Sequence, residues 1–148
     1  MTTGSSAVVV EERPAAVMKT WPHSPRSVGR ARRLLVHHLD AWGMPHLIDP
    51  AQLVLSELVT NSVRHARSPQ GHLIATRFER LDQGLRIEVH DANESKPERR
   101  RTSASAEFGR GLALVDALTG GQWGVSDREG PGKMVWAVFN DTNIEDAG

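Results

Sequence analysis

The sequence predicts an α+β fold, a two-layer α/β sandwich in which three helices cover one face of a mixed, mostly antiparallel sheet. Two segments carry apolar residues at helical spacing, and a third helical segment follows a Gly-Arg-Gly turn. Short apolar runs bounded by turn residues are typical of strands. The elements follow one another as strand, helix, helix, strand, strand, long loop, helix, strand and strand. This order favours helices on one face of a largely antiparallel sheet.

The composition limits the classes to which the protein can belong. Its 148 residues suit one domain, which we expect over residues 14–140, with a disordered tail at 1–13 and a second tail at 141–148. The absence of cysteine excludes disulfides and thiolate zinc sites. Eighteen Lys and Arg balance eighteen Asp and Glu, which argues against direct binding of nucleic acid through its phosphates. Because the sequence has neither a signal peptide nor a membrane-length apolar stretch, we expect a cytoplasmic protein.

The first strand and the first helix are predicted from local signals. The apolar run Ala15–Trp21 suits a strand. Ser24 can cap the following helix and Pro25 suits its first turn, while Gly43 and Pro45 end it. The apolar stripe of this helix, at helical spacing, consists of Val28, Ala31, Leu35, Leu39 and Trp42.

The second helix has the clearest predicted start in the chain. Asp49 is the expected N-cap, Pro50 is the expected first helical residue, and Gln52 completes a pattern like a capping box. We expect the helix to continue to Ala66 and to end before Pro69. Its core-facing side is predicted to consist of Leu55, Leu58, Val59 and Ser62.

The rest of the sequence predicts a hairpin, a long polar loop, a helix and two further strands. Leu73–Phe78 and Leu85–His90 are the expected hairpin strands, joined by a turn at Asp82–Gly84. Residues 92–108 carry almost no apolar side chains, and a loop of this length is either functional or disordered. The last three elements are expected at Leu112–Leu118 for the helix, and at Gln122–Asp127 and Met134–Phe139 for the strands.

Polar residues on the second helix are candidates for a metal–phosphate site. Glu57 and Asn61 lie four residues apart and share a helix face, which Arg64 and His65 continue. A carboxylate and a carboxamide oxygen suit Mg²⁺, which prefers oxygen ligands and usually keeps several waters. A solvated helix face with an ordinary polar pair is the alternative that this helix alone leaves open.

Two further features each allow a functional and a structural interpretation. Asp91 closes a predicted strand, where its carboxylate could accept a hydrogen bond from a ligand amine or simply form an Asx turn. Gly109, Arg110 and Gly111 precede a helix, where exposed N–H groups favour an anion such as phosphate. Tight packing without a ligand is the alternative for these glycines. The P-loop pattern is missing from the sequence.

Taken in order, these segments resemble the GHKL ATPase superfamily, whose domain is also called the Bergerat fold. The stretch ELVTNSVRHA at Glu57–Ala66 is similar to the family's N box. VHDANESKP at Val89–Pro97 is similar to its first glycine box, and GRGLALVDAL at Gly109–Leu118 to its second. The stretch Gly120–Phe139 is similar to the family's final strands, so the resemblance covers most of the chain.

The resemblance implies an ATP site with Mg²⁺ as a cofactor. Asn61 would coordinate the Mg²⁺, Glu57 would act as the catalytic base, and Asp91 would accept a hydrogen bond from the adenine amino group. Two positions depart from the family pattern, since Asn93 stands in place of a glycine near the adenine and Lys133 in place of a threonine. The other residues that the resemblance places at the nucleotide, mainly at its phosphates, are Arg64, His65, Gly109, Arg110, Gly111 and Leu112.

Within the superfamily, the short length makes the chain most similar to the small anti-sigma-factor serine kinases. Such proteins transfer the γ-phosphate of ATP to a serine of a STAS-domain antagonist and sequester a sigma factor. The resemblance therefore implies both of these proteins as partners, suggests a homodimer, and implies neither a membrane nor nucleic acid as a direct partner. A non-catalytic module that binds ATP, or only a partner protein, is the alternative from a different functional class.

Overall fold

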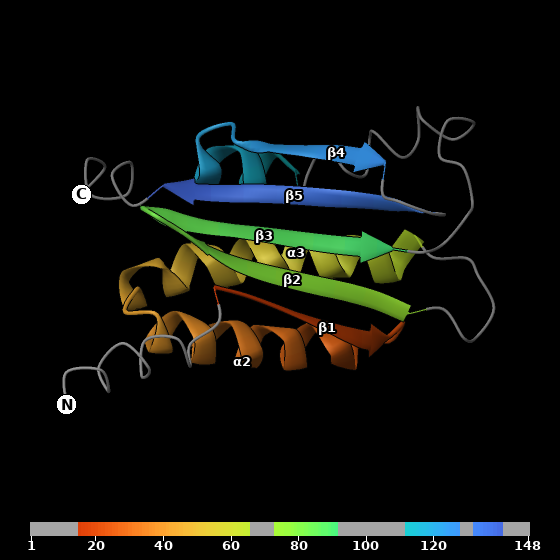
Figure 1. The fold of residues 1–148 in the computed structure, drawn as a ribbon. Helices are drawn as coiled ribbons and strands as arrows, with labels where there is room; N and C mark the ends of the chain where they lie inside the picture. The colour runs from red at the N-terminus through yellow and green to blue at the C-terminus, as the bar shows by residue number, and fades with distance from the viewer. Residues whose placement is uncertain (1–14, 66–72, 92–111, 128–131, 141–148) are drawn as a thin grey trace.

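A computed structural model describes residues 15–65, 73–91, 112–127 and 132–140, and in these residues it forms a single five-stranded sheet. The strands are β1 (Ala16–Pro22), β2 (Leu73–Leu81), β3 (Gly84–Asp91), β4 (Trp123–Asp127) and β5 (Lys133–Asn140). Their order across the sheet is β1-β2-β3-β5-β4 (Figure 1). All four pairings are antiparallel, so the described sheet is antiparallel throughout rather than mixed.

The helices lie together behind this sheet in the view of Figure 1. They are α2 (Arg26–Ala41), a short 3-10 helix η1 (Pro45–Leu47), α3 (Ile48–His65) and a helical segment at residues 112–119. The predicted two-layer α+β architecture is therefore confirmed. No helix among the described residues is long and apolar enough to cross a membrane. The predicted tails at 1–13 and 141–148 and the long loop at 92–108 lie outside the described residues.

Both ends of α2 follow the signals in the sequence. The Oγ atom of Ser24 accepts a hydrogen bond from the backbone N–H of Arg26 at 3.2 Å. At the other end, Gly43 takes a positive φ of 75°, and the N–H of Met44 donates to the carbonyl of Leu39 at 2.8 Å. This is the pattern of a Schellman motif, in which glycine supplies the left-handed residue that ends the helix.

The start of α3 differs from the prediction. Asp49 is not the N-cap, because the helix already begins at Ile48, which directly follows the 3-10 turn Pro45–Leu47. Leu47 in this turn is completely buried, and Ile48, which follows it, already has a helical conformation with φ −59° and ψ −50°. Asp49 and Pro50 still suit the first turn, since a carboxylate there interacts favourably with the helix dipole and proline gives up an N–H that has no partner within the helix.

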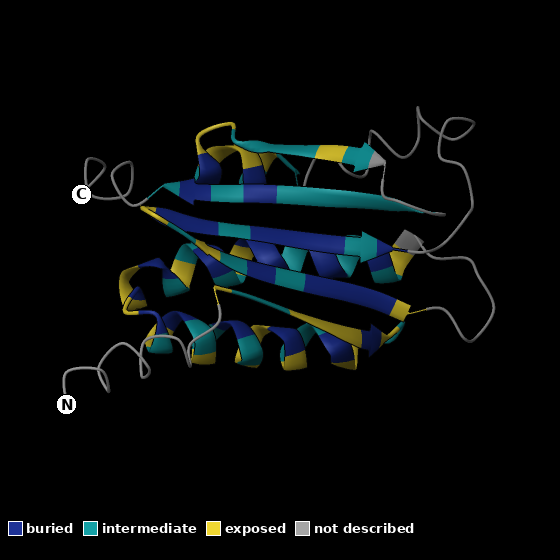
Figure 2. Ribbon diagram, in the orientation of Figure 1, coloured by how far each residue is buried: buried dark blue, intermediate teal, exposed yellow. Residues whose placement is uncertain are grey.

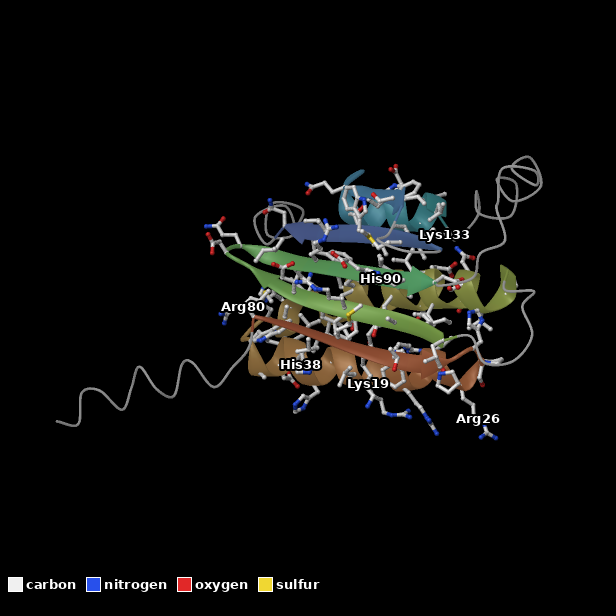
Figure 3. All side chains as sticks on the ribbon, turned by 45° about the vertical axis from the view of Figure 1, so that its right-hand side comes forward. Lys19, Arg26, His38, Arg80, His90 and Lys133 are labelled. Carbon is white, nitrogen blue, oxygen red and sulfur yellow. The ribbon has the colours of Figure 1, made fainter. Side chains whose placement is uncertain are left out.

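The open face of the described sheet carries a network of charged side chains (Figure 3). Glu88 on β3 is only 8% exposed, and its carboxylate lies 2.7 Å from Arg86 Nε and 2.8 Å from His90 Nε2. Arg77 on β2 lies 3.5 Å from the same carboxylate and 2.8 Å from Glu79. Burial raises the pKa of the Glu88 carboxyl, but hydrogen bonds from Arg86 and His90 and the charges of Arg86 and Arg77 outweigh it. The pKa therefore lies below its ordinary value.

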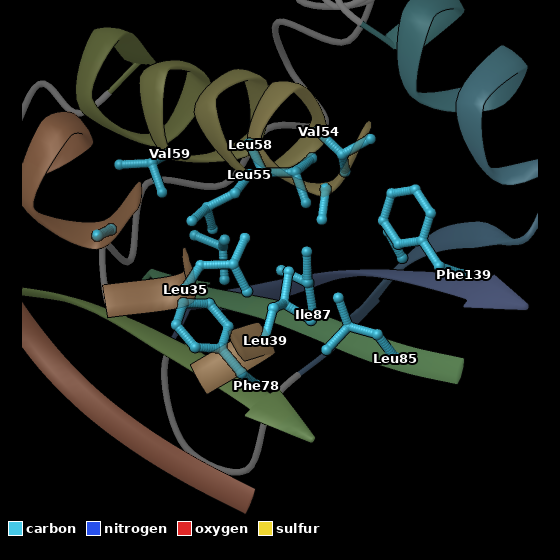
Figure 4. Packing of buried hydrophobic residues seen from close by; sticks show 14 of the residues in the cluster. Leu35, Leu39, Val54, Leu55, Leu58, Val59, Phe78, Leu85, Ile87 and Phe139 are labelled. Atoms are coloured by element: carbon cyan, nitrogen blue, oxygen red, sulfur yellow. The ribbon is translucent and has the colours of Figure 1, made fainter. Parts of the chain in front are cut away.

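The hydrophobic core fills the space between the sheet and the helices. Figure 2 shows buried residues along one side of α2 and α3, and Figure 4 shows how their side chains meet those of the sheet. The predicted stripe of α2 is buried at Ala31, Leu35, Leu39 and Trp42, and that of α3 at Leu55, Leu58, Val59 and Ser62. Against these stripes pack the sheet residues Ile74, Phe78, Leu85, Ile87, Ala137 and Phe139. The core thus fixes how α3 is rotated relative to β3 and β5.

Candidate functional site

A pocket opens beside the core, where α3 passes the ends of β3 and the start of β5. Its volume is about 390 Å³ when the open solvent at its mouth is included. Five of its lining residues are apolar and four are polar. They are Leu58, Val89, Leu112, Val125, Val135, Asn61, Ser62, Asp91 and Lys133.

The strands supply one wall of this pocket through their alternation. Because successive residues of a strand point to opposite faces, Val89 and Asp91 face the helices while Glu88 and His90 face outward. Asp91 is paired with Lys133 of β5 in the sheet register, so the two side chains are neighbours on the same face of the sheet. The end of one strand and the start of the next therefore place a carboxylate and an ammonium group at one edge of the pocket.

Helix α3 supplies the opposite wall. Leu58, Asn61 and Ser62 lie three and four residues apart and so share one side of the helix. Leu58 and Ser62 are buried, whereas Asn61 is half-buried at the border between the core and the pocket. The same helix face thus provides an apolar surface, a hydroxyl group and a carboxamide.

Asp91 is the most buried charged group of the pocket, at 5% exposed. Its Oδ2 atom accepts a hydrogen bond from Ser62 Oγ at 2.8 Å, and its Oδ1 atom lies 3.5 Å from Nε2 of His23. Burial of a carboxylate is costly unless hydrogen bonds or charges compensate for it. The Ser62 hydroxyl therefore holds the carboxylate in a defined orientation at the wall of the pocket, and the His23 ring lies near its other oxygen.

The structure brings together three of the residues that the sequence singled out. Asn61, Asp91 and Leu112 all line the pocket, although they come from α3, β3 and the helical segment 112–119. Glu57 lies one turn before Asn61 on α3, is half-buried, and is not among the lining residues. Arg64 follows on the same helix and is exposed.

The other predicted contact residues cannot be placed. Asn93, Gly109, Arg110 and Gly111 lie outside the described residues, and of His65 only its place at the end of α3 is described. Their assignment to the site remains a prediction from the sequence.

Three pocket or pocket-adjacent residues were missed as functional candidates. Ser62 was assigned to the core side of its helix, and a polar residue within an apolar stripe is the signal that could have marked it. His23 lies near Asp91 from the segment between β1 and α2, and this contact joins residues far apart in the sequence, which no local pattern reveals. Lys133, noted in the sequence only as a departure from the family pattern, is the register partner of Asp91 and lines the pocket.

The arrangement suits a flat, partly polar ligand. The valine and leucine side chains offer apolar walls, the Asp91 carboxylate can accept hydrogen bonds from an amine, and the Asn61 carboxamide oxygen can bind a cation. Among residues 15–65, 73–91, 112–127 and 132–140, no three His, Cys, Asp or Glu side chains gather as a metal site. A cation at Asn61 would therefore need further ligands from a bound molecule and from water.

Comparisons with known proteins agree with the fold. A protein-family model described as a histidine kinase-like ATPase domain matches residues 21–139. Among solved structures, the histidine kinase domain of the blue-light activated histidine kinase from Erythrobacter litoralis EL346 matches with a TM-score of 0.57 and 22% sequence identity. The match covers 84% of this chain but only 64% of that one, and at this identity it shows the fold alone. No curated protein matches the chain.

Proposed function

The chain belongs to the family of histidine kinase-like ATPase domains, and from this premise we propose that it binds ATP and transfers the γ-phosphate to a serine of a partner protein. The proposed activity is that of an anti-sigma-factor serine kinase, with a STAS-domain antagonist as the protein that is phosphorylated and a sigma factor as the protein that is sequestered. Both partners are inferred from the resemblance of the sequence to such kinases.

The observation that carries the proposal is that Asn61 and Asp91, from different elements, line one pocket. A carboxylate held by the Ser62 hydroxyl at 2.8 Å is oriented to accept a hydrogen bond from the amino group of adenine. Val89 of β3 and Val135 of β5 are register partners that line the pocket, and they would offer an apolar surface to the purine ring. Recognition of the base would thus combine one fixed polar contact with apolar contacts, as in most small-molecule sites.

The donor set at Asn61 is compatible with Mg²⁺ bound together with a nucleotide. Mg²⁺ would neutralise negative charge on the phosphates when bound. Asn61 offers one carboxamide oxygen from the half-buried border of α3, and the phosphates and water would complete an octahedral shell. The proposed role of Asn61 is to fix the position of the phosphates relative to the base, which Asp91 would hold in the same pocket.

Glu57 would meet the serine hydroxyl of the partner protein. It lies one helical turn from Asn61 on the same side of α3, outside the pocket lining and half-buried. From there its carboxylate can accept the hydroxyl proton as the serine oxygen bonds to the γ-phosphorus of ATP, while the bond from that phosphorus to the bridging oxygen breaks and ADP leaves. Phosphoryl transfer requires mainly positioning and charge neutralisation, so one base beside a well-held phosphate suffices.

Incubation with labelled ATP, Mg²⁺ and a purified STAS-domain protein tests the proposal. We expect label on a serine of that protein with the wild-type chain and none with Asn61→Ala. The matched control is Asn140→Ala at the far end of β5, which should transfer label like the wild type. Equal labelling by the Asn61→Ala variant would contradict the site assignment.

A non-catalytic partner-binding module is the second candidate function. It is favoured by Lys133, which lines the pocket at the position where the resembled kinases carry a threonine. The same incubation separates the two functions, because a stable complex with the partner that carries no label would support the module. A thermal shift with ATP then tells whether that module still binds the nucleotide, since a ligand that binds the native state stabilises it.

A further inference from the structure

A second concave surface lies away from the pocket, between β1 and α2. It is an open groove of about 850 Å³, with Lys19, Thr20 and Trp21 of β1 on one side. Arg30, Arg33 and His37 of α2 form the other side. Figure 3 shows Lys19 and Arg26 along this border of the molecule. None of the residues proposed for nucleotide binding contributes to the groove.

The groove is strongly cationic. Arg30, Arg33 and His37 are exposed and share one face of α2, and exposed Lys19 extends over the ring of Trp21 at 5.4 Å. No Asp or Glu is among the described residues that line it. Since the whole chain has equal numbers of acidic and basic side chains, this concentration of charge is local. A surface of this kind attracts an anionic partner.

Strand β1 adds a second recognition element, because it forms an edge of the described sheet. The Ala15 carbonyl accepts a hydrogen bond from the N–H of Arg80 on the β2 side, and the register continues without a break from Ala16 to Pro22. In an antiparallel pair, the residues that bond to the neighbour alternate with residues whose N–H and C=O point away. Met18 and Thr20 therefore present their backbone groups to the open edge.

We propose that this groove binds an extended acidic segment of a partner protein, which adds a strand to the edge of β1. The backbone of the segment would bond to Met18 and Thr20, and its acidic side chains would face α2. Alternate residues of a strand are about 6.7 Å apart, and Arg30 and His37 are separated by about 10.5 Å along the helix axis. Two or three alternating carboxylates therefore match the row of basic side chains formed by Arg30, Arg33 and His37.

The edge that β1 forms in the described sheet favours a peptide over a nucleic acid. Strand addition draws its affinity from main-chain hydrogen bonds and its specificity from alternate side chains. A nucleic acid would use the cations of α2 but would gain nothing from the N–H and C=O groups of β1. The backbone edge of β1 should therefore contribute to the binding of a peptide but not to the binding of a nucleic acid.

Binding of a fluorescein-labelled heptapeptide of alternating glutamate and valine, measured by anisotropy, tests the charge component. We expect Arg33→Glu to lower the affinity at least about fivefold, since it places like charge opposite the peptide. Arg32→Glu is the matched control, because Arg32 is the exposed neighbour on α2 and does not line the groove. A heptapeptide of alternating glutamine and valine should bind weakly to all three proteins. Equal loss from Arg32→Glu and Arg33→Glu would overturn the proposal.

Thr20→Pro tests the edge. Proline removes an N–H that points away from β2, and it is tolerated at such edge positions. We expect Thr20→Pro to lose binding of the acidic heptapeptide, while Thr20→Ala retains it and both variants keep the ATP-induced thermal shift of the wild type. A Thr20→Pro variant that melts normally and still binds the peptide, or an oligothymidylate of equal charge that binds as tightly as the peptide, would show a general polyanion surface and refute strand addition.

Discussion

Two buried carboxylates on β3, Glu88 and Asp91, stand three residues apart and face opposite sides of the sheet. Glu88 is 8% exposed and Asp91 is 5% exposed, so burial does not distinguish them. Glu88 has Arg86, His90 and Arg77 within 3.5 Å, and Arg77 also pairs with Glu79 on the open face. Asp91 instead has the Ser62 hydroxyl on one oxygen and His23 near the other, at the wall of a pocket.

The difference shows what makes a buried carboxylate a candidate for ligand binding. At Glu88 the surrounding cations offset the cost of burial and lower the pKa of the carboxyl, so the group stabilises the sheet. Asp91 instead accepts a hydrogen bond from a hydroxyl and lines a space into which a ligand amine could enter. The position at the wall of a pocket, rather than burial itself, therefore makes Asp91 the candidate for ligand binding.

The largest effect expected on the pocket side is at Glu57. We expect Glu57→Ala to retain ATP binding and to lower the rate of phosphotransfer about 10²–10⁴-fold, because it removes a general base. Glu79→Ala on the open face is the matched control and should transfer at the wild-type rate. Calorimetry with ATP together with a timed transfer assay measures both quantities. Equal loss of binding and transfer in Glu57→Ala would contradict a purely catalytic role.

A paired substitution of the two carboxylates tests the comparison directly. We expect Asp91→Ala to weaken ATP binding about 10- to 100-fold, the value of a hydrogen bond to a charged group, while Glu88→Ala leaves binding unchanged. In urea denaturation, Glu88→Ala should lower the free energy of unfolding by about 1–3 kcal/mol, because it leaves Arg86 and Arg77 without their shared partner. The comparison fails if Glu88→Ala weakens ATP binding as much as Asp91→Ala does.

A smaller effect is expected from Lys133→Thr. Lys133 is the register partner of Asp91 and lines the same pocket, so under the proposed binding mode its ammonium group would compete with the amino group of adenine for the carboxylate. We expect the substitution to tighten ATP binding about two- to fivefold, the scale of a partly screened charge interaction. Lys19→Thr, in the groove beside α2, serves as the control for the loss of one positive charge. Weaker binding by Lys133→Thr would indicate that the lysine contacts the phosphates instead.

The smallest effect concerns the pH dependence of stability at Glu88. Its pKa is lowered in the folded protein, so its stabilising contribution is fully present above the unfolded value of about 4.3 and is lost as the pH falls through the folded value. We expect the melting temperature of Glu88→Gln to fall less steeply than that of the wild type in this acidic range. Thermal melts by circular dichroism between about pH 5 and pH 3 measure this difference. Parallel curves would show that the network does not depend on the charge of Glu88.

Most of the fold was predictable because its signals are local. The Schellman end of α2 at Gly43 and the apolar stripes of both long helices are fixed by residues within one or two turns of each other. The start of α3 was not predictable in this way, since Asp49 and Pro50 suit either an N-cap followed by a first helical residue or two positions within the first turn. Burial of Leu47 in the core decides between these alternatives, and burial is a property of the assembled fold.

The candidate site was predictable only in part for the same reason. Asp91 was identifiable because it ends a strand before a long polar stretch, and Asn61 because it shares a helix face with Glu57. The contact that orients the carboxylate joins Ser62 to a residue 29 positions away, and Lys133 reaches the pocket only through the register of β5. Such contacts follow from the pairing of strands and the rotation of α3, which no short segment determines.

Because Glu88 and Asp91 point to opposite faces of the sheet, β3 is also sensitive to the insertion or deletion of a residue. One residue inserted between them would turn Asp91 to the open face and bring its neighbour into the pocket, although the composition of the strand would hardly change. A substitution at a half-buried position such as Arg86 or His90 changes one side chain, whereas a single insertion or deletion would exchange the two faces of the strand beyond it. In a library of variants, length changes in this strand should therefore be depleted more strongly than substitutions at Arg86 or His90.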